Sequence, residues 1–312
     1  MNDIVIETQN LSKQYGNLLA VNDLNLEIKK GEVFGFLGPN GSGKTTAINM
    51  MVGLLKPTNG KVIIGGNNAP DDVKGGIGVM PQEIVIWDNL TCMENLMVIG
   101  DMYDVPKDVI RERVHKLLTD LQLIDKKDAL SHTLSGGMKR RLNLAMALIH
   151  EPDILVLDEP SPGLDPQSRR VLWNYIKTLS DGKKTIILTT HDMEEADRLS
   201  DRVAIIDHGK LLILDTPENL KNKIGKGDIV EIKLRDEGMN KKIVQEIASI
   251  DEIEESKEVG GKIYIRALNA VKNLSTIFNL ITSSGGDIVD VKIRKNTLED
   301  VFITLTGKEL RE

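Results

Sequence analysis

Short apolar runs recur along the chain at intervals that suit a buried sheet. Residues 33–37 and 154–157 are almost wholly apolar, and residues 185–190 and 202–207 continue the pattern. Runs of this length without polar alternation are typical of strands that are covered on both faces. We therefore expect an α/β core with a parallel sheet, to which residues 211–214 add a further strand.

Two other regions carry different patterns. Residues 3–30 alternate apolar and polar positions, which predicts antiparallel strands. Residues 83–150 show no strand repeat and are interpreted as helices. Thr91 and Glu94 form a capping box that opens one of these helices, and residues 109–121 are a second amphipathic candidate.

The last part of the chain predicts a smaller unit. Residues 216–218 begin a short helix, and the Lys- and Gly-rich residues 221–227 are interpreted as a linker. Beyond it the expected order is strand, helix, strand, strand, helix, strand, at residues 229–234, 241–249, near 253, 263–267, 271–283 and 288–293. This order predicts an α+β, ferredoxin-like unit, so we divide the chain into residues 1–224 and 225–312.

A glycine-rich loop joins the first apolar run to a helical stretch at residues 47–52. It consists of Gly38, Pro39, Asn40, Gly41, Ser42, Gly43, Lys44, Thr45 and Thr46. The glycines let backbone N–H groups turn toward phosphates, and the helix points the positive end of its dipole at them. The pattern predicts a nucleoside triphosphate site in which Lys44 bridges the β- and γ-phosphates and Thr45 binds Mg²⁺. The strand and helix flanks disfavour the alternative of a glycine-rich turn without a ligand.

Asp158 and Glu159 end the apolar run at residues 154–157, where a parallel strand brings side chains to the carboxyl edge of its sheet. We expect Asp158 to hold the Mg²⁺ shell through water. We expect Glu159 to polarise the water that attacks the γ-phosphate. Alone, the pair would fit a solvated acidic turn, but the preceding phosphate loop favours the catalytic interpretation.

A second anion-binding pattern stands at Ser135, Gly136 and Gly137, at the start of a helical stretch that reaches Ile149. A serine and two glycines at a helix start leave backbone N–H groups available to an anion. In this interpretation the phosphates of one nucleotide already lie on the first loop. Another molecule must therefore supply the second ligand.

Together, these motifs resemble those of the ATP-binding subunits of ABC transporters, over about residues 3–224. In that family the Leu-Ser-Gly-Gly signature of one protomer closes on the γ-phosphate held by the other. The resemblance thus implies that Ser135 and Gly137, with Gly136 between them, act in trans across a head-to-tail homodimer that holds ATP and Mg²⁺.

The resemblance also assigns roles to four residues that lie in the family's order along the chain. Tyr15 matches the aromatic residue that stacks on adenine. Gln82 matches the glutamine that touches Mg²⁺ and water, and that responds to the membrane partner. Asp165 matches the acidic residue of the loop through which protomers communicate, and His191 matches the histidine that contacts the γ-phosphate.

The fold implied for residues 1–224 is that of a P-loop NTPase of the ABC type. It has a mixed sheet core, an antiparallel β subdomain and a helical subdomain at about residues 83–150. In the family a groove near Gln82 receives a coupling helix of the membrane subunit. The apolar residues 84–87 would suit that groove or, equally, the buried core.

Two features resemble one branch of the family. Met138 stands where many members carry glutamine, and residues 296–307 look like the tail of drug-resistance and ABC-2 exporter ATPases. Residues 225–312 carry no catalytic signature, and their role could be homodimer stabilisation, regulation or stability of the ATPase domain. The three basic residues at 139–141 are interpreted as a solvated face.

Composition agrees with an ATPase that works beside a separate membrane protein. No apolar stretch approaches the roughly 18–20 residues needed to cross a bilayer, and the N-terminus lacks a signal-peptide pattern. The net charge of −7 argues against direct binding of nucleic acid, and the single cysteine, Cys92, fits a reducing cytoplasm. We expect a peripheral subunit on the cytoplasmic face of the cell membrane that powers an integral membrane permease.

Two other function classes fit the sequence less well. A non-transport ABC ATPase acting on ribosomes or DNA usually has two cassettes, a coiled-coil insertion or basic extensions, and none is visible in the sequence. A module that binds ATP without hydrolysing it is disfavoured because Glu159 and His191 are both present.

Overall fold

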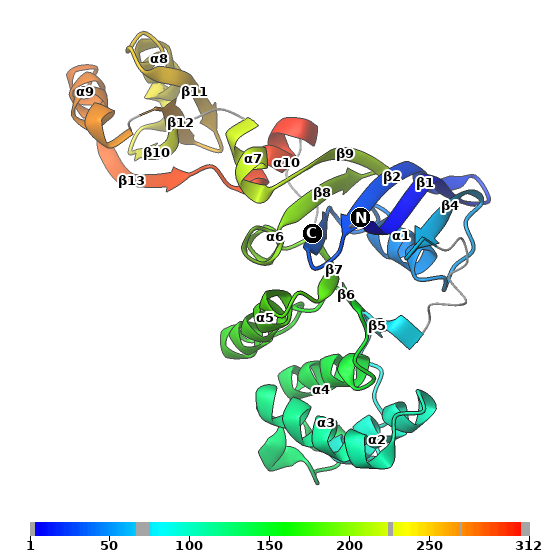
Figure 1. Cartoon of the computed structure of the whole chain (residues 1–312). Helices are drawn as coiled ribbons and strands as arrows, with labels where there is room; N and C mark the ends of the chain where they lie inside the picture. The colour runs from blue at the N-terminus through cyan, green and yellow to red at the C-terminus, as the bar shows by residue number, and fades with distance from the viewer. Residues whose placement is uncertain (1–3, 67–74, 224–226, 269, 307–312) are drawn as a thin grey trace. The chain divides into compact units, whose positions relative to one another are not determined.

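The computed structural model describes residues 4–66, 75–223, 227–268 and 270–306. It divides into two compact units, one ending at Pro217 and the other beginning at Glu218 (Figure 1). The domain boundary expected after residue 224 falls at residues 224–226, outside the described residues, and stays a prediction. The expected linker does not begin at Lys221, because that residue belongs to helix α7 (Pro217–Lys223).

The first unit is built on a six-stranded sheet in the order β5-β6-β7-β3-β8-β9. Its strands are β3 (Val33–Leu37), β5 (Ile77–Met80), β6 (Ile154–Asp158), β7 (Thr185–Thr190), β8 (Arg202–Asp207) and β9 (Lys210–Asp215). All neighbouring strands pair in parallel except β8 and β9, which are antiparallel. Strands β3, β6 and β7 are buried throughout, which explains their continuous apolar sequences. The expected parallel sheet is confirmed, with β9 as an antiparallel edge strand.

Successive side chains of the central strands enter two different cores. Leu155 and Leu157 of β6 pack in one with the helices, whereas Ile154 and Val156 pack in another with a second sheet. That sheet has the order β2-β1-β4, is antiparallel, and consists of β1 (Ile4–Tyr15), β2 (Leu18–Lys29) and β4 (Asn59–Ile64). Helix α1 (Lys44–Met51) contributes to the same core. The glycine loop before α1 is thereby held at the carboxyl edge of the main sheet.

The region expected to be helical is formed by α2 (Cys92–Met102), α3 (Lys107–Asp120) and α4 (Gly136–Leu148), with two 3₁₀ turns, η2 (Ile124–Lys126) and η3 (Ser131–Thr133). The capping box is confirmed. The Glu94 amide donates to Thr91 Oγ1 at 3.1 Å, and the Thr91 amide donates to Glu94 Oε2 at 2.8 Å. Cys92 is buried at the start of α2. Two further helices, α5 (Pro166–Asp181) and α6 (Met193–Leu199), follow β6 and β7.

The second unit contains a four-stranded antiparallel sheet in the order β11-β12-β10-β13. Its elements are β10 (Asp228–Leu234), η4 (Glu237–Met239), α8 (Asn240–Ile247), β11 (Ile253–Val259), β12 (Lys262–Ala267), α9 (Ala270–Ser283), β13 (Ile288–Lys295) and α10 (Leu298–Thr306). Apolar residues of β10 and β12 pack with those of α8 and α9 in a core of their own. The chain order and the strand order are those of a ferredoxin-like α+β unit.

Candidate active site

The glycine loop follows β3 and ends at Gly43, the N-cap of α1, where φ is +102°. A Cβ on Gly43 would lie 2.3 Å from the carbonyl oxygen of Ala20, and one on Gly38 would lie 2.2 Å from that of Ile206. Both glycines are therefore required by the close approach of neighbouring backbone. Pro39 is buried below the loop, whereas Asn40, Gly41 and Thr45 are exposed and Thr46 is half-buried.

Lys44 is 5% exposed, and its ammonium lies among oxygen atoms. It donates to the carbonyl oxygens of Gly38 at 2.7 Å and Pro39 at 3.1 Å, and lies 3.5 Å from Glu159 Oε1. Burial lowers the pKa of Lys44, and the carboxylates of Glu159 and Asp158 oppose that shift. A cation held this way is suited to the negative charge of a polyphosphate.

Asp158 is placed by the register of β6 against β7, which pairs it with Thr189. The Thr189 hydroxyl donates to Asp158 Oδ1, and the Thr45 hydroxyl lies 3.3 Å from the same oxygen. Thr45 and Asp158, each predicted to take part in Mg²⁺ binding, therefore lie together. The contact of Thr189 with Asp158 was not predicted. The sequence feature that could have indicated it is the pair of threonines that ends the strand before His191.

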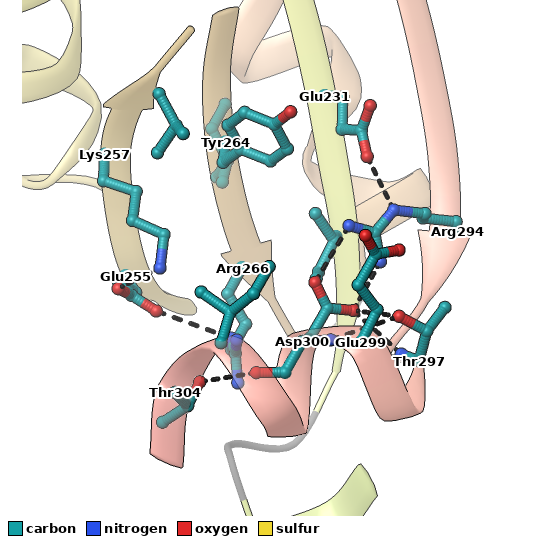
Figure 2. Close-up of a pocket in the computed structure, with 14 residues that line it drawn as sticks. Glu231, Glu255, Lys257, Tyr264, Arg266, Arg294, Thr297, Glu299, Asp300 and Thr304 are labelled. Atoms are coloured by element: carbon teal, nitrogen blue, oxygen red, sulfur yellow. Dashed lines mark hydrogen bonds and ion pairs between the residues drawn. The ribbon is translucent and has the colours of Figure 1, made fainter. Parts of the chain in front are cut away.

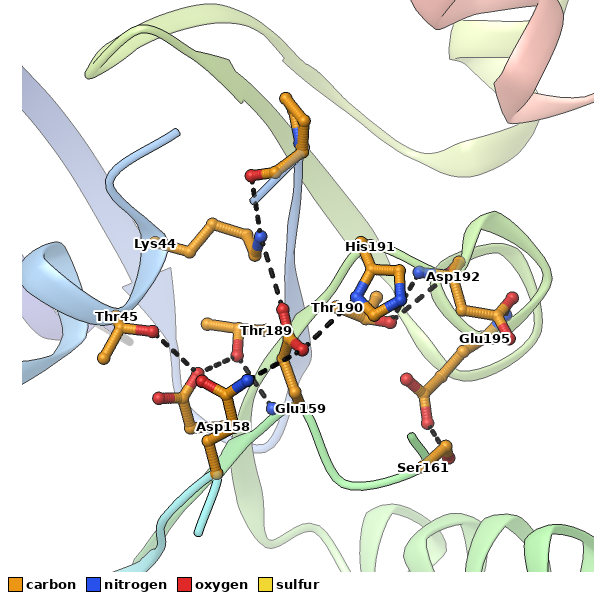
Figure 3. A network of polar contacts seen from close by, with 12 residues as sticks. Lys44, Thr45, Asp158, Glu159, Ser161, Thr189, Thr190, His191, Asp192 and Glu195 are labelled. Carbon is orange, nitrogen blue, oxygen red and sulfur yellow. Dashed lines mark hydrogen bonds and ion pairs between the residues drawn. The ribbon is translucent and has the colours of Figure 1, made fainter. Parts of the chain in front are cut away.

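Glu159 is the point at which the predicted catalytic side chains meet (Figure 3). Gln82 Nε2 donates to Glu159 Oε2 at 3.4 Å, and His191 Nδ1 lies 3.3 Å from that oxygen. The carboxylate is almost wholly buried. Lys44 and these two side chains come from three separate segments of the chain, so only the fold brings them together.

The backbone of Glu159 is also unusual, with φ at +47°. Outside glycine, this left-handed region costs of order 1 kcal/mol or more and persists only where the surroundings hold it. The amide of Glu159 donates to Thr189 at both its carbonyl oxygen, 3.1 Å away, and its Oγ1, 3.0 Å away. The strained residue is thus anchored from β7.

These residues fit a nucleotide with Mg²⁺. Ser42 Oγ is buried in the glycine loop without a hydrogen-bond partner within the described part of the chain, as expected of a group that binds a ligand. The hydroxyl of Thr45, the carboxylate of Asp158 and the amide of Gln82 offer the oxygen ligands that Mg²⁺ prefers. Among the described residues, no three His, Cys, Asp or Glu side chains converge on one metal position.

The signature residues lie elsewhere in the first unit. Ser135 caps α4 by accepting from the Met138 amide at 3.3 Å, and Ser135 and Gly136 are exposed. A Cβ on Gly137 would lie 2.4 Å from Ser168 Oγ. Among the hydrogen bonds and ion pairs of the described residues, none joins these three residues to Lys44 or Glu159.

Asp165 lies beside this helix start. It caps α5 by accepting from the amides of Gln167 and Ser168, each at 3.0 Å. Hydrogen bonds from Ser168, followed by that from Gln167, hold the pKa of Asp165 below its ordinary value. The loop and the signature are therefore packed together at the N-termini of two adjacent helices.

Tyr15 lies at the end of β1 and is 47% exposed. The Lys13 ammonium is 5.3 Å from the centre of its ring. No hydrogen bond or ring contact of the described residues joins Tyr15 to Lys44 or Glu159. Its ring lies at the surface rather than buried in packing.

The interpretation of residues 139–141 as a solvated face is wrong for two of the three. Arg140 and Arg141 are 4% and 8% exposed, whereas Lys139 pairs with Asp88 at the surface. Arg141 donates to the carbonyl oxygen of Leu121 at 2.7 Å. Arg140 donates to backbone carbonyls around Gln82 and Glu159. Three consecutive basic residues look alike in the sequence. Their burial differs because successive residues of a helix point in directions about 100° apart.

A buried glutamate on α6 was also missed. Glu195 Oε1 accepts from the Ser161 hydroxyl and, at 2.9 Å, from Trp173 Nε1. Burial raises the pKa of Glu195, although hydrogen bonds from Ser161, Thr190 and Trp173 oppose the shift. These contacts join the segment before Asp165 to the helix that follows His191. A glutamate in a short amphipathic helix gives no sequence signal for such a role.

The second unit has a cavity of about 330 Å³ between its open sheet face and α10 (Figure 2). Arg294 donates to Glu231 and to Asp300, each at 2.6 Å. Lys257 lies 3.1 Å from Glu255. The residues that line the cavity include none of the predicted nucleotide-site residues, and its three basic side chains pair with Glu231, Glu255 and Asp300.

Comparisons with known proteins agree with the geometry of the first unit. The sequence model of the ABC transporter family matches residues 21–162, and that of the C-terminal domain of DrrA1-3-like ATP-binding proteins matches residues 216–306. The linearmycin resistance ATP-binding protein LnrL of Bacillus subtilis is 35% identical over 313 residues, which cover 99% of this chain and 100% of that protein. A Nod factor export ATP-binding protein I of Cupriavidus metallidurans is 36% identical over 317 residues, with 99% of each chain covered.

Solved structures extend the likeness to the fold. A dimeric ATP-binding cassette in a post-hydrolysis state, bound to ADP and phosphate, has a TM-score of 0.61 and 26% identity, and the match covers 68% of this chain and 98% of that one. Relatives that match along their whole length at more than 30% identity share more than a fold. The chain therefore belongs to the ATP-binding proteins of ABC transporters, with a C-terminal domain of the DrrA1-3 type, and is an ATPase.

Proposed function

We propose that the glycine loop binds the triphosphate of ATP, and that Glu159 activates the water that cleaves it. The observation that carries this proposal is the meeting of Lys44, Gln82 and His191 at one buried carboxylate. The backbone amides of residues 38–46 and the Lys44 ammonium hold the phosphates. Tyr15, exposed at the end of β1, stacks on the adenine.

The chemistry follows from the position of each group. Glu159 accepts a proton from water as the water oxygen bonds to the γ-phosphorus, while the bond from that phosphorus to the bridging oxygen of ADP breaks. His191 and Lys44 stabilise the charge on the transferred phosphoryl group. Thr45, Asp158 and Gln82 would hold Mg²⁺, directly or through water. When bound, the ion neutralises the charge of the β- and γ-oxygens.

The partner copy supplies the other side of the nucleotide site. Ser135 and Gly136 are exposed at the start of α4, and no hydrogen bond or ion pair of the described residues joins them to Lys44 or Glu159. An exposed helix start of this kind suits the γ-phosphate on a second protomer. The solved cassette bound to ADP and phosphate is a dimer, which supports a homodimer here. The exposure of Ser135 and Gly136 favours its head-to-tail arrangement. Asp165, packed beside Gly137, would carry the state of one site to the other.

A separate permease is the second partner. Of the four apolar residues after Gln82 and Glu83, Ile84, Val85 and Trp87 are 41%, 58% and 42% exposed, and only Ile86 packs against the core. Of the two alternatives left open for these residues, burial in the core is thus wrong for three of them. We assign this apolar surface to a coupling helix of the permease. In the described ranges, no helix combines the length and apolarity needed to cross a bilayer.

The names of the relatives favour export as the direction of transport. Their names record resistance to linearmycin and export of Nod factor, and we propose an exporter of ABC-2 type that works at the cytoplasmic face of the cell membrane. The permease, rather than this chain, would set most of the substrate contacts.

Glu159→Gln tests the catalytic assignment. The amide keeps the size of the side chain but cannot accept the proton, so turnover is expected to fall by about 10²–10⁴-fold while ATP binding persists. Incubation with ATP should then accumulate a closed dimer, measured by light scattering after size-exclusion chromatography. Glu194→Gln, at an exposed neighbouring glutamate, is the matched control. Equal turnover by wild type and Glu159→Gln would remove Glu159 from the mechanism.

The trapped variant also tests the partner assignment. Purified with ATP from mildly solubilised native membranes, it is expected to carry a polytopic permease. Recovery of ribosomes or DNA-repair proteins without a membrane protein would contradict the transport assignment.

A further inference from the structure

Arg140 is a buried cation on the second turn of the signature helix α4, with 4% of its surface exposed. Its Nε donates to the carbonyl oxygen of Pro160 at 2.9 Å. Nη1 donates to the carbonyl oxygen of Gln82 at 2.5 Å, and Nη2 donates to that of Glu159. Every hydrogen bond that this side chain makes within the described part of the chain thus ends on a backbone carbonyl.

Such a placement is costly for a cation. Burial lowers the pKa of Arg140, and the more distant carboxylates of Asp158, Glu195 and Glu159 offset this only in part. Arginine is suited to the position because its planar guanidinium presents donors in several fixed directions at once. A lysine carries the same charge but cannot span carbonyls on two separate segments with one ammonium in fixed geometry.

The two segments that Arg140 joins both lead to the Glu159 carboxylate. Thr189 holds the amide side of the strained Glu159 backbone, and Arg140 holds its carbonyl side. The Gln82 carbonyl is bound by the same guanidinium, while the Gln82 side chain lies 3.4 Å from the Glu159 carboxylate. The guanidinium therefore fixes the backbones of two residues whose side chains meet.

We propose that Arg140 is a positioning residue for ATP hydrolysis, which sets the Glu159 carboxylate and the Gln82 amide against each other. It does so from the helix that begins at Ser135, so it also ties the signature helix to the hydrolytic site of its own chain. The inference rests on the proposed role of Glu159. It assigns no contact between Arg140 and ATP.

The test separates binding from turnover in the full-length chain. Arg140→Lys and Arg140→Gln are expected to lower kcat by about 10- to 100-fold, because the base and its partner lose their alignment. Their Kd for a fluorescent ATP analogue should stay within about threefold of wild type, since the glycine loop and Lys44 are untouched. Lys139→Met, at the half-buried neighbouring position that pairs with Asp88, is the matched control and should keep wild-type values for both.

A double variant shows whether Arg140 acts through Glu159. In the Glu159→Gln background, Arg140→Lys should lower the residual turnover by less than twofold, because residues that act as a unit are non-additive. A full additional loss in that background would overturn the proposal. So would wild-type kcat in both single variants, or a loss of ATP binding in parallel with kcat, which would indicate a general structural role.

Two outcomes separate the role of Arg140 from that of Glu159. If Glu159→Gln abolishes turnover while Arg140→Lys does not change it, only the role of Arg140 is lost. If Glu159→Gln turns over ATP at the wild-type rate, the assignment of Glu159 falls and the role given to Arg140 falls with it.

Discussion

Buried charge is the main feature of the active site at the scale of single residues. Lys44 and Glu159 are each about 5% exposed and lie 3.5 Å apart, so each reduces the cost of burying the other. The pKa of Lys44 is nevertheless lowered by its burial. Nearby carboxylates therefore do not fully offset the burial of the ammonium, which suits it to a ligand with more negative charge.

Lys44→Ala is expected to weaken ATP binding itself. Loss of a hydrogen-bonded charge of this kind costs about 1.5–3 kcal/mol, or roughly 10- to 150-fold in Kd. Equilibrium titration with a fluorescent ATP analogue measures the change. Lys177→Ala, at an exposed lysine on α5, serves as the control. An unchanged Kd in Lys44→Ala would contradict the assignment of the glycine loop to the triphosphate.

At the scale of helices, α2 and α3 pack so closely that a side chain at position 100 would have almost no space. A Cβ on Gly100 of α2 would lie 1.9 Å from Cδ1 of Ile110, a fully buried residue of α3. Glycine in a helix interior lowers helix stability relative to alanine, so the close contact, rather than propensity, explains this residue. The side chain of Ile110 occupies the space that Gly100 leaves.

Gly100→Ala is therefore expected to destabilise the first unit by about 1–3 kcal/mol, despite the better helix propensity of alanine. Ile110→Ala alone should cost about 2–5 kcal/mol by leaving a cavity. The double variant should cost less than the sum, because the new methyl group enters that cavity. Urea unfolding followed by tryptophan fluorescence measures all three, with Gly75→Ala, whose Cβ meets no neighbour, as the control. Additive costs would show that the two positions do not press on each other.

The whole molecule consists of two units with separate cores, and the second contains a carboxyl group whose pKa is lowered by its folded surroundings. In the second unit, burial tends to raise the pKa of Asp300, but hydrogen bonds from Arg294 and Thr297 outweigh it and hold the pKa below the ordinary value. A carboxyl group with a lowered folded-state pKa contributes stability above its unfolded pKa, near 4. That contribution is lost as the pH falls through the folded-state pKa.

We expect the free energy of opening of the second unit to fall as the pH drops from about 5 to below 4, with Asp300→Asn showing a smaller fall. At pH 7 that variant should be less stable by about 1–3 kcal/mol, the usual range for a hydrogen-bonded charge. Hydrogen exchange of peptides from β10 and β13, read by mass spectrometry, reports this unit alone. Asp290→Asn, at an exposed aspartate of β13, should follow the wild type. An identical pH profile in Asp300→Asn and wild type would show that this carboxyl group does not cause the pH dependence of the opening free energy.

Local spacing was enough to predict much of the fold, together with Lys44, Asp158 and Glu159 at the candidate site. The strand, loop and helix around Lys44, the strand that ends in Asp158, and the capping box at Thr91 all depend on residues that are near neighbours in the chain. Backbone geometry imposes fixed periods on such segments, and these periods are visible in the sequence. The family resemblance supplied Gln82 and His191, which no local pattern would have joined to Glu159.

The sequence by itself determined which segments become strands and helices, and where the phosphate loop stands between them. Only the tertiary structure decided that Arg140 is buried among backbone carbonyls while the half-buried Lys139 pairs with the exposed Asp88, since the two differ in environment rather than in local pattern. Arg140 and Gln82 are 58 positions apart, and their contact exists because β5, β6 and α4 pack together. A charged side chain enters such a site only where distant backbone carbonyls converge on it, and that convergence is a property of the folded chain.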